Sequence, residues 1–203
     1  MAARKPPKEN TDAFAALRAA MQACRGCDLY KNATQVVPGE GNEHAPIMFV
    51  GEQPGDVEDR EGHPFVGPAG RLLDRALDEA GIDRSKVFVT NAVKHFSWEP
   101  RGKRRIHKKP TLKQVAACID WLHSEIRLVR PRIIVCLGAT ATQALLGPKV
   151  KVTQARGTFV ESELPAHVLV TVHPSSILRG DPEDRARAFT AFVNDLKQIA
   201  KRM

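Results

Sequence analysis

The chain alternates short apolar runs with longer segments whose apolar residues recur every three to four positions. Each short run predicts a buried strand, and each longer segment predicts an amphipathic helix. The predicted strands are Ile47–Val50, Val87–Thr90, Arg132–Leu137 and Val168–Thr171. Strands that alternate with helices are typical of an α/β fold with a mainly parallel sheet.

Capping and breaking residues mark the ends of the expected helices. Thr11 is expected to cap the first one, and Thr111 with Gln114 forms a capping box for a long helix that ends before Pro131. The helix expected over Pro68–Ala80 should end at Gly81, because glycine readily adopts the left-handed conformation found after helix ends. The other expected helices are Ala139–Leu146 and one that Asp181-Pro182 opens.

The length of 203 residues is that of one domain. We expect a single domain over residues 11–203, preceded by a flexible basic tail over residues 1–10, and a monomer by default. No apolar run approaches the roughly 18 residues of a membrane span, and no apolar segment follows the basic N-terminus as in a signal peptide. The expected compartment is therefore the cytoplasm, with no membrane partner.

The charge balance is basic, with 31 Lys and Arg against 23 acidic residues and a net charge of +8. Such a balance is expected of a nucleic-acid-binding protein, although many soluble proteins share it. Six of the basic residues fall within residues 101–109, a stretch that contains no acid: Arg101, Lys103, Arg104, Arg105, Lys108 and Lys109. A solvated loop that contacts phosphates accounts for most of them.

Polar, Gly-rich or Pro-rich turns follow the predicted strands. Ligands of open α/β sheets bind beyond the carboxyl ends of the strands, so a pocket is expected there. Glu52 could act on a ligand or be an ordinary solvated residue of a turn. Phe65, held between prolines and glycines, could stack on a base or plug the core. Asn91 offers a donor and an acceptor that could read a base edge or cap a turn.

The cysteine spacing predicts a metal site. Cys24 and Cys27 form a C-x-x-C pair, and Cys118 and Cys136 bring the count to four, as in iron–sulfur or zinc sites. Cys136, however, lies in an apolar predicted strand, where a cysteine is usually packing.

Four motifs occur together in an order and spacing that resemble the family-four uracil-DNA glycosylases. They are Gly-Glu-x-Pro-Gly at 51–55, Pro64-Phe65-Val66-Gly67 with Gly70, Thr90-Asn91-x-Val93-Lys94, and His173-Pro174-Ser175. The resemblance implies a three-layer α/β/α fold with a central, mainly parallel four-stranded sheet. It also implies excision of uracil from DNA, with single strands accepted, and a nucleoid-associated enzyme.

The resemblance assigns roles to individual residues. Glu52 assists glycosidic cleavage, Phe65 stacks on uracil, Asn91 reads its polar edge and His173 stabilises the departing uracil anion. These roles suit the chemistry, because a flipped base must be held while charge develops on it and on the sugar. Further implied contacts to uracil come from Gly51, Gln53 and Asp56, and contacts to DNA from Lys103, Arg104, Arg105, Ser175 and Arg179.

The family carries a [4Fe–4S] cluster whose third cysteine directly follows the Asn-x-Val-Lys segment, where this chain has His95. The implied ligands are therefore Cys24, Cys27, His95 and Cys118. Whether His95 or Cys136 is the fourth ligand stays open. Base excision needs no electron transfer, so the cluster is expected to be structural.

The string Lys103-Arg104-Arg105-Ile106-His107, together with Gln53, looks like the X-type subgroup (UdgX). In that subgroup the histidine of this loop attacks the sugar C1′ after uracil leaves, and the protein stays attached to the DNA. His107 is the implied nucleophile, with Glu52 orienting it and Arg105 holding the loop. The surrounding positive charge disfavours protonation of the ring, so a neutral imidazole is expected.

Two other functions remain open. In a conventional multiple-turnover glycosylase, water would take the place of His107. In a non-catalytic DNA-binding module, the same pocket would only recognise uracil or single strands.

Overall fold

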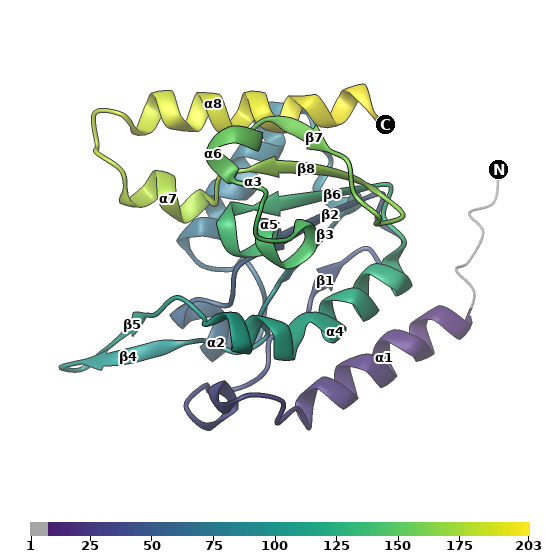
Figure 1. Ribbon diagram of the computed structural model, residues 1–203, viewed down its shortest axis with the longest axis vertical. Helices are drawn as coiled ribbons and strands as arrows, with labels where there is room; N and C mark the ends of the chain where they lie inside the picture. The colour runs from purple at the N-terminus through teal and green to yellow at the C-terminus, as the bar shows by residue number, and fades with distance from the viewer. Residues whose placement is uncertain (1–7) are drawn as a thin grey trace.

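A six-stranded sheet forms the centre of the computed structural model, which describes residues 8–203. The strand order is β1-β3-β2-β6-β8-β7; β3, β2, β6 and β8 run parallel, and the two edge strands run antiparallel to them (Figure 1). Gly51 pairs with Asn91, so the carboxyl ends of β2 and β3 lie side by side. The strands are β1 Glu40–Gly41, β2 Ile47–Gly51, β3 Val87–Asn91, β6 Ile133–Leu137, β7 Thr158–Val160 and β8 His167–Thr171.

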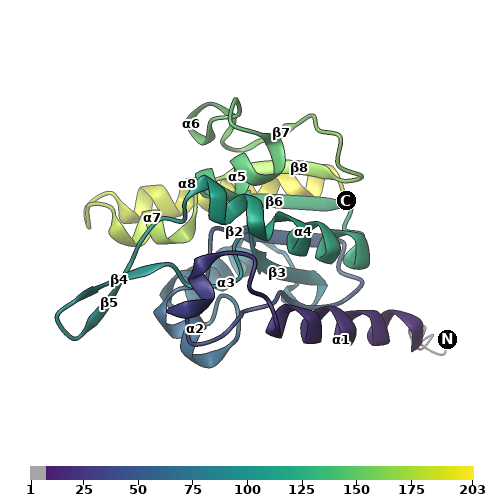
Figure 2. The ribbon, with the colours of Figure 1, turned by 60° about the horizontal axis from the view of Figure 1, so that its bottom comes forward.

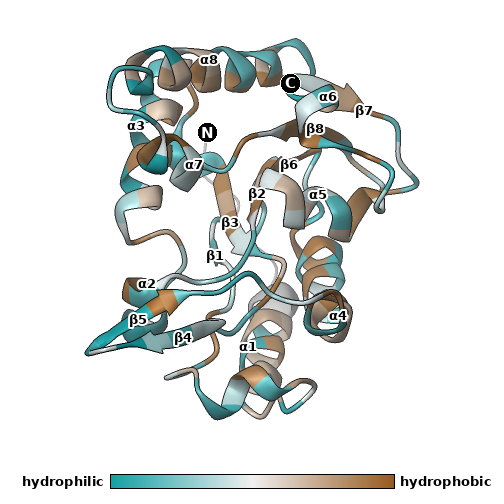
Figure 3. Cartoon of the chain, turned by 60° about the vertical axis from the view of Figure 1, so that its left-hand side comes forward, coloured by the Kyte–Doolittle hydropathy of each residue, from teal (hydrophilic) through white to brown (hydrophobic). Residues whose placement is uncertain are grey.

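Helices cover both faces of this sheet, as the expected three-layer α/β/α fold requires (Figures 1 and 3). Within residues 8–203 no helix is both long enough and apolar enough to cross a membrane. The helices are α1 Lys8–Gln22, α2 Asp56–Glu61, α3 Pro68–Ala80, α4 Leu112–Val129, α5 Gly138–Leu146, α6 Val152–Ala155, α7 Pro174–Arg179 and α8 Arg185–Lys197. Short 3-10 segments occupy Asp28–Lys31, Arg84–Lys86 and Gln198–Lys201.

Alternation along the parallel strands builds two cores. Ile47 and Phe49 pack against α3 and α8, whereas Met48 and Val50 face α1 and α4 on the other side. Successive side chains of a strand point to opposite faces, so an entirely apolar run can be buried on both. The apolar runs therefore gave the positions of the four central strands.

The sheet differs from the prediction in having six strands instead of four. The additional strands, β1 and β7, contain two and three residues and lie at the edges. Such short strands carry no recognisable periodicity, because a pattern of period two needs four or more residues to be seen.

The basic stretch predicted as a loop is a two-stranded hairpin. Its strands are β4 Trp98–Arg101 and β5 Arg104–His107, with Gly102 in the left-handed region at the turn. The hairpin extends away from the body of the protein (Figure 2). Pro100 within β4 hid the strand from the pattern, since proline is confined to edge strands and bulges.

Two predicted helix starts were wrong. The first helix begins at Lys8, so Thr11 does not cap it; lysine and glutamate are good helix formers and extend it. The last helix begins at Arg185, because Asp181 instead accepts a hydrogen bond from the Glu183 backbone and holds a turn. The predicted tail lies outside the described residues for residues 1–7, and residues 8–10 belong to α1.

The helix ends predicted from capping residues are confirmed elsewhere. The capping box of Thr111 and Gln114 opens α4, and Gly81 in the left-handed conformation closes α3.

Candidate active site

A cavity of about 660 Å³ opens where the parallel strands end, which is the edge that the sequence predicted. The loop after β2, the turn before α3, the hairpin and the start of α7 all contribute to its wall. The predicted site residues that line it are Glu52, Gln53, Asp56, Phe65, Asn91, His107, His173, Ser175 and Arg179.

Three of these side chains come close to one another beside Gly51. A Cβ atom built at this position would lie 2.4 Å from Asn91 Oδ1, 2.8 Å from Phe65 Cζ and 3.4 Å from His173 Nε2. Real Cβ atoms do not approach other atoms so closely, so only glycine permits this convergence. An aromatic ring, an amide and an imidazole therefore meet at one point of the cavity.

Phe65 is held in a strained backbone conformation. Its φ of 60° lies in the left-handed region, which is uncommon for a bulky residue and is found most often at functional sites. A Cβ on Gly70 would lie 1.6 Å from the Phe65 carbonyl oxygen, so glycine there lets α3 approach the turn. The ring packs partly against the core and also lines the cavity, which combines the two roles left open by the sequence.

The buried carboxylate of Glu58, which the sequence did not reveal, links the loop after β2 to the turn before α3. Glu58 accepts hydrogen bonds from the Gly67 backbone N–H at 2.9 Å and from the Gly55 N–H at 3.1 Å. Its place in α2 gave no sign of this role, because both partners are backbone groups.

His173 caps the N-terminus of α7 with its own ring. Nδ1 accepts a hydrogen bond from the Ser175 backbone N–H at 3.1 Å and lies 2.8 Å from Ser175 Oγ. Burial lowers the pKa of His173 to about 4, against the opposing attraction of Glu52. The ring is therefore neutral at pH 7, and its one proton sits on Nε2, which faces the point above Gly51.

This burial predicts a pH dependence of stability. The native ring stays neutral down to about pH 4, whereas an exposed histidine in the unfolded chain takes up a proton near pH 6.5. The free energy of unfolding should therefore fall as the pH drops from 6.5 to 4, by at most about 1.4 kcal/mol per pH unit for this group.

Urea unfolding of the wild-type protein and of His173→Gln, at several pH values in this window, measures that contribution. As the pH drops from 6.5 to 4, the free energy of unfolding should fall more for the wild-type protein than for His173→Gln. A difference that is the same at every pH would contradict the buried, neutral ring.

Glu52 lies between Thr140 and His107. Its Oε2 accepts a short hydrogen bond from Thr140 Oγ1 at the start of α5, and its Oε1 lies 3.2 Å from His107 Nε2. Burial raises the pKa of Glu52, but the hydrogen bonds from His107 and Thr140 outweigh burial and leave the pKa below its ordinary value. Glu52 is thus a carboxylate at neutral pH, aimed at His107.

The sequence marks Thr140 only as part of a turn that follows a strand. Its contact with Glu52, 88 positions away along the chain, is visible only in the folded protein.

The hairpin that carries His107 is fixed at its base by Gln53. Its Nε2 donates to the carbonyl oxygens of Ser97 at 3.0 Å and Lys108 at 3.1 Å, and its Oε1 accepts from the Ser97 N–H at 3.1 Å. Ser97 and Lys108 are the residues that flank the two strands. The hydrogen-bonding groups of Gln53, expected to contact uracil, are engaged with the backbone next to His107.

Arg105 anchors the same hairpin to α2. Its Nε donates to Asp56 Oδ1 at 2.5 Å, its Nη1 donates to Asp59 Oδ2 at 2.6 Å, and its guanidinium lies over the rings of Phe96 and Trp98. This arrangement fits the expected role of holding the segment against the site. A contact of Arg105 with DNA, or of Asp56 with uracil, stays a prediction.

Lys103 and Arg104, in contrast, are exposed around the turn of the hairpin.

The cysteines divide into two groups. Cys27 and Cys118 lie in one small apolar cluster with Leu29, and burial raises the pKa of the Cys118 thiol to about 11. Trp121 Nε1 donates to Cys24 Sγ at 3.3 Å. Cys136 is fully buried in the core between the sheet and α4, as expected of a packing residue.

The predicted metal ligands are not fully assembled. Within residues 8–203, no three His, Cys, Asp or Glu side chains are placed to hold a metal ion. The donor chemistry does fit a thiolate-bound cluster, because Cys27 and Cys118 share an apolar cluster with Trp121, whose Nε1 donates to Cys24 Sγ. His95 is buried two positions after Val93 of this cluster, and its Nδ1 has no hydrogen-bond partner among residues 8–203. An unpartnered buried nitrogen is costly, which a bound group would relieve.

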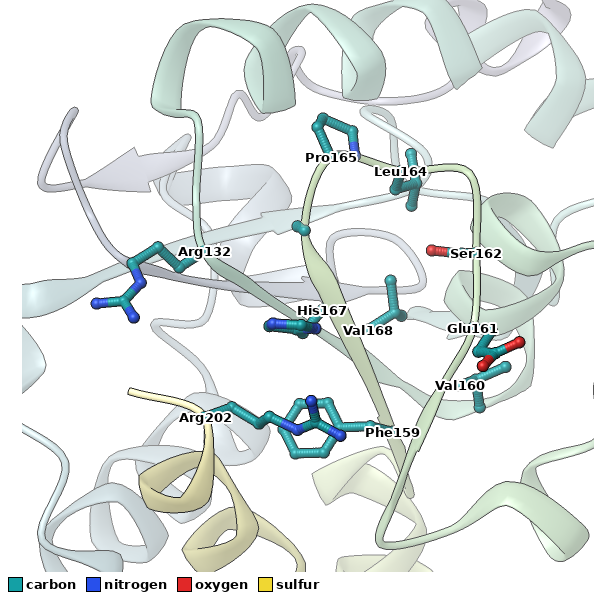
Figure 4. A pocket seen from close by; sticks show the side chains of 11 residues that line it. Arg132, Phe159, Val160, Glu161, Ser162, Leu164, Pro165, His167, Val168 and Arg202 are labelled. Carbon is teal, nitrogen blue, oxygen red and sulfur yellow. The ribbon is translucent and has the colours of Figure 1, made fainter.

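A second cavity, of about 810 Å³, lies at the opposite edge of the sheet, where β6 and β8 begin (Figure 4). Arg132, His167 and Arg202 surround its mouth, and the Arg202 guanidinium covers the Phe159 ring. None of the predicted site residues lines it. The chemistry predicted from the sequence therefore belongs to the cavity at the carboxyl edge.

Comparisons with known proteins agree with this geometry. Residues 38–197 match the uracil DNA glycosylase superfamily. The chain is 39% identical over 183 residues to the type-4 uracil-DNA glycosylase of Thermotoga maritima, covering 90% of this chain and 92% of that protein. It is 38% identical over 188 residues to the type-4 enzyme of Archaeoglobus fulgidus, with 89% and 88% covered.

A more distant match is the type-5 uracil-DNA glycosylase of Pyrobaculum aerophilum, at 30% identity over 157 residues, with 70% of this chain and 66% of that protein covered. On the extent of these matches, the chain belongs to the uracil DNA glycosylase superfamily.

Proposed function

We propose that this protein excises uracil from DNA and then keeps the resulting deoxyribose as a covalent adduct on His107. The observation that carries the proposal is the 3.2 Å contact between His107 Nε2 and Glu52 Oε1 at the wall of the cavity. A histidine paired with a carboxylate is the arrangement of an activated nucleophile. The same cavity holds the groups suited to bind a flipped base.

Uracil enters the cavity as a flipped base. The Phe65 ring offers a stacking surface, the Asn91 amide offers both a donor and an acceptor to the polar edge, and His173 Nε2–H points to the same place. A neutral donor stabilises the uracil anion as it forms, because its hydrogen bond strengthens while charge develops.

The covalent step exchanges one bond for another. The C1′–N1 bond breaks, and its electron pair leaves with uracil as the anion. Glu52 Oε1 takes the proton from His107 Nε2, and the electron pair of that N–H bond forms the new bond from Nε2 to C1′. The ring ends as a neutral N-alkyl imidazole, and Glu52 as a carboxylic acid. The uracil anion then takes a proton from Glu52 or from water, which balances the charge.

Positive groups at the rim suit a DNA strand. Lys103 and Arg104 are exposed around the hairpin turn, and exposed Arg179 lines the cavity together with Ser175. Contacts of this kind go to phosphates and position the strand without reading its sequence. Single-stranded DNA as a substrate is a part of the proposal that rests on the sequence resemblance, and the monomeric state is a default expectation.

The protein is also proposed to bind a [4Fe–4S] cluster through Cys24, Cys27, Cys118 and His95. When bound, the cluster would supply a structural cross-link and no redox step. These residues lie just after α1, just after β3 and in α4, so the cross-link would hold three segments together. The support is the grouping of three thiols and the unpartnered Nδ1 of His95.

Metal analysis tests the cluster. Protein purified without oxygen should contain about four iron atoms per chain, because one cluster of this type holds four. The purified protein should be brown, and Cys118→Ser should reduce the iron content. Stoichiometric zinc in place of iron would contradict the proposal.

A conventional multiple-turnover glycosylase is the rival function, and it fits the type-4 uracil-DNA glycosylase relatives as well. Denaturing gel electrophoresis after incubation with single-stranded uracil-containing DNA separates the possibilities. A shifted band that survives boiling in detergent supports the adduct. Alkali-labile abasic DNA without a shift supports the rival. Unchanged DNA would indicate a non-catalytic DNA-binding module.

A further inference from the structure

We propose that Lys94, through a buried ion pair with Glu125, is a positioning residue for Asn91 and hence for uracil recognition. The inference rests on the proposed role of Asn91 in the cavity. It starts from a charge that the chemistry described above does not use. The Lys94 side chain has no exposed surface, and that of Glu125 is 2% exposed.

All three protons of the Lys94 ammonium are used. Nζ donates to Glu125 Oε2, to Thr90 Oγ1 and to the backbone carbonyl oxygen of Asn91, each at 2.7 Å. Glu125 is equally saturated: its Oε1 accepts from the Gly39 N–H at 2.7 Å, and its Oε2 also accepts from Thr90 Oγ1 at 2.6 Å. The network is therefore complete, and its contact nearest to the cavity is the Asn91 carbonyl.

The hydrogen bond from Lys94 holds the carbonyl group of the peptide unit between Asn91 and Ala92, and β2 holds the N–H group of the same unit. The Ala92 N–H donates to the Gly51 carbonyl oxygen at 2.9 Å, while the Asn91 carbonyl of the same peptide accepts from Lys94. A peptide held at both its N–H and its C=O cannot rotate, because the unit is planar. The Asn91 side chain leaves the backbone immediately before this unit, so its direction into the cavity is set there.

Helix α4 provides the support for this arrangement through Glu125, which receives the Lys94 side chain. The Lys94 carbonyl oxygen also accepts a hydrogen bond from the Val37 N–H at 2.8 Å, which holds the main chain at this point. The Lys94 side chain therefore connects the helix to the end of β3.

A buried ion pair is a poor way to gain stability alone. Removing two charges from water costs as much as their attraction returns, and neutral residues of similar size are often tolerated. A positioning role gives the pair a different use, since an ammonium group holds a carbonyl more firmly than a neutral donor does.

The test uses the double variant Lys94→Met, Glu125→Gln, because a single change would leave a buried charge without its partner. The introduced glutamine can still accept from the Gly39 N–H and donate to Thr90, while Asn91 loses its ammonium donor. The variant should fold, and its rate of uracil release should fall about ten- to a hundredfold. Asp74→Asn, which alters an ion pair with Arg84 whose two residues do not line the cavity, is the control and should leave the rate near that of the wild type.

A double-mutant cycle separates positioning from general loosening of the fold. In the Asn91→Ala background, the Lys94→Met, Glu125→Gln changes should cause no further fall in the rate of release. An equal fall in both backgrounds, or a folded double variant with the wild-type rate, would overturn the proposal.

An NMR measurement makes the test independent of activity. The side-chain amide signal of Asn91, assigned by its loss in Asn91→Ala, should shift or broaden in the double variant. An unchanged signal would overturn the positioning role even if the wild-type protein released no uracil, in which case the proposed function would fail separately.

Discussion

Replacing His107 with serine is expected to abolish the heat-stable protein–DNA adduct while uracil release remains measurable. The groups that hold and stabilise uracil, Phe65, Asn91 and His173, lie outside the hairpin and should keep their positions. Serine also leaves room for water to reach C1′. The variant should thus behave as a conventional glycosylase, with abasic DNA as its product.

Denaturing gels with labelled uracil-containing DNA measure both products in one experiment. His167→Ser is the matched control, because it makes the same change at an exposed histidine beside the opposite cavity. It should form the adduct as the wild type does. An undiminished shifted band from His107→Ser would show that another residue is the nucleophile. Loss of uracil release in a folded variant would show that the division of roles is wrong.

Replacing Glu52 with glutamine is expected to slow adduct formation by about a hundredfold or more, the usual contribution of a general base. The amide keeps the size of the side chain but cannot take up the proton of His107 Nε2. The wild-type carboxylate should stay ionised through the neutral range, because its pKa lies below the ordinary value. This group should therefore cause no loss of rate between about pH 8 and pH 5.

Single-turnover time courses of the shifted band give the rate. Glu99→Gln is the matched control, since Glu99 lies on the same hairpin and is exposed. If Glu52→Gln formed the adduct at the wild-type rate, Glu52 would have no part in the chemistry.

The core of the fold could be predicted because it depends on local patterns. Ile47–Val50 and Ile133–Leu137 are continuous apolar runs, which only a strand buried on both faces requires. Alternating strands and helices also predict parallel strands, whose carboxyl ends all lie at one edge of the sheet. That is why Glu52, Asn91 and His173 were expected together.

The hairpin could not be predicted in the same way. Its strands are short, basic and interrupted by Pro100, and they pair only with each other. They are held by Gln53, Asp56 and Asp59 from the other side of the site, contacts that join residues 44 to 55 positions apart. A local pattern carries no information about such contacts.

The same reason explains the missed supporting residues. Thr140 beside Glu52 and the Lys94–Glu125 pair act through hydrogen bonds between residues far apart in the sequence. Glu58 binds the nearby backbone N–H groups of Gly55 and Gly67, which no side-chain pattern marks. The pairing of His107 with Glu52, 55 positions earlier in the sequence, was implied by the family resemblance and not by any local pattern. In the structure His107 Nε2 lies 3.2 Å from Glu52 Oε1.

Peptide mass spectrometry of the purified adduct identifies the residue that bonds to the deoxyribose. After nuclease and trypsin digestion, a deoxyribose remnant is expected on the peptide that contains His107, with fragment ions that place it on that ring. An unmodified His107 peptide, with the remnant on another residue or with no remnant at all, would show that His107 is not the nucleophile.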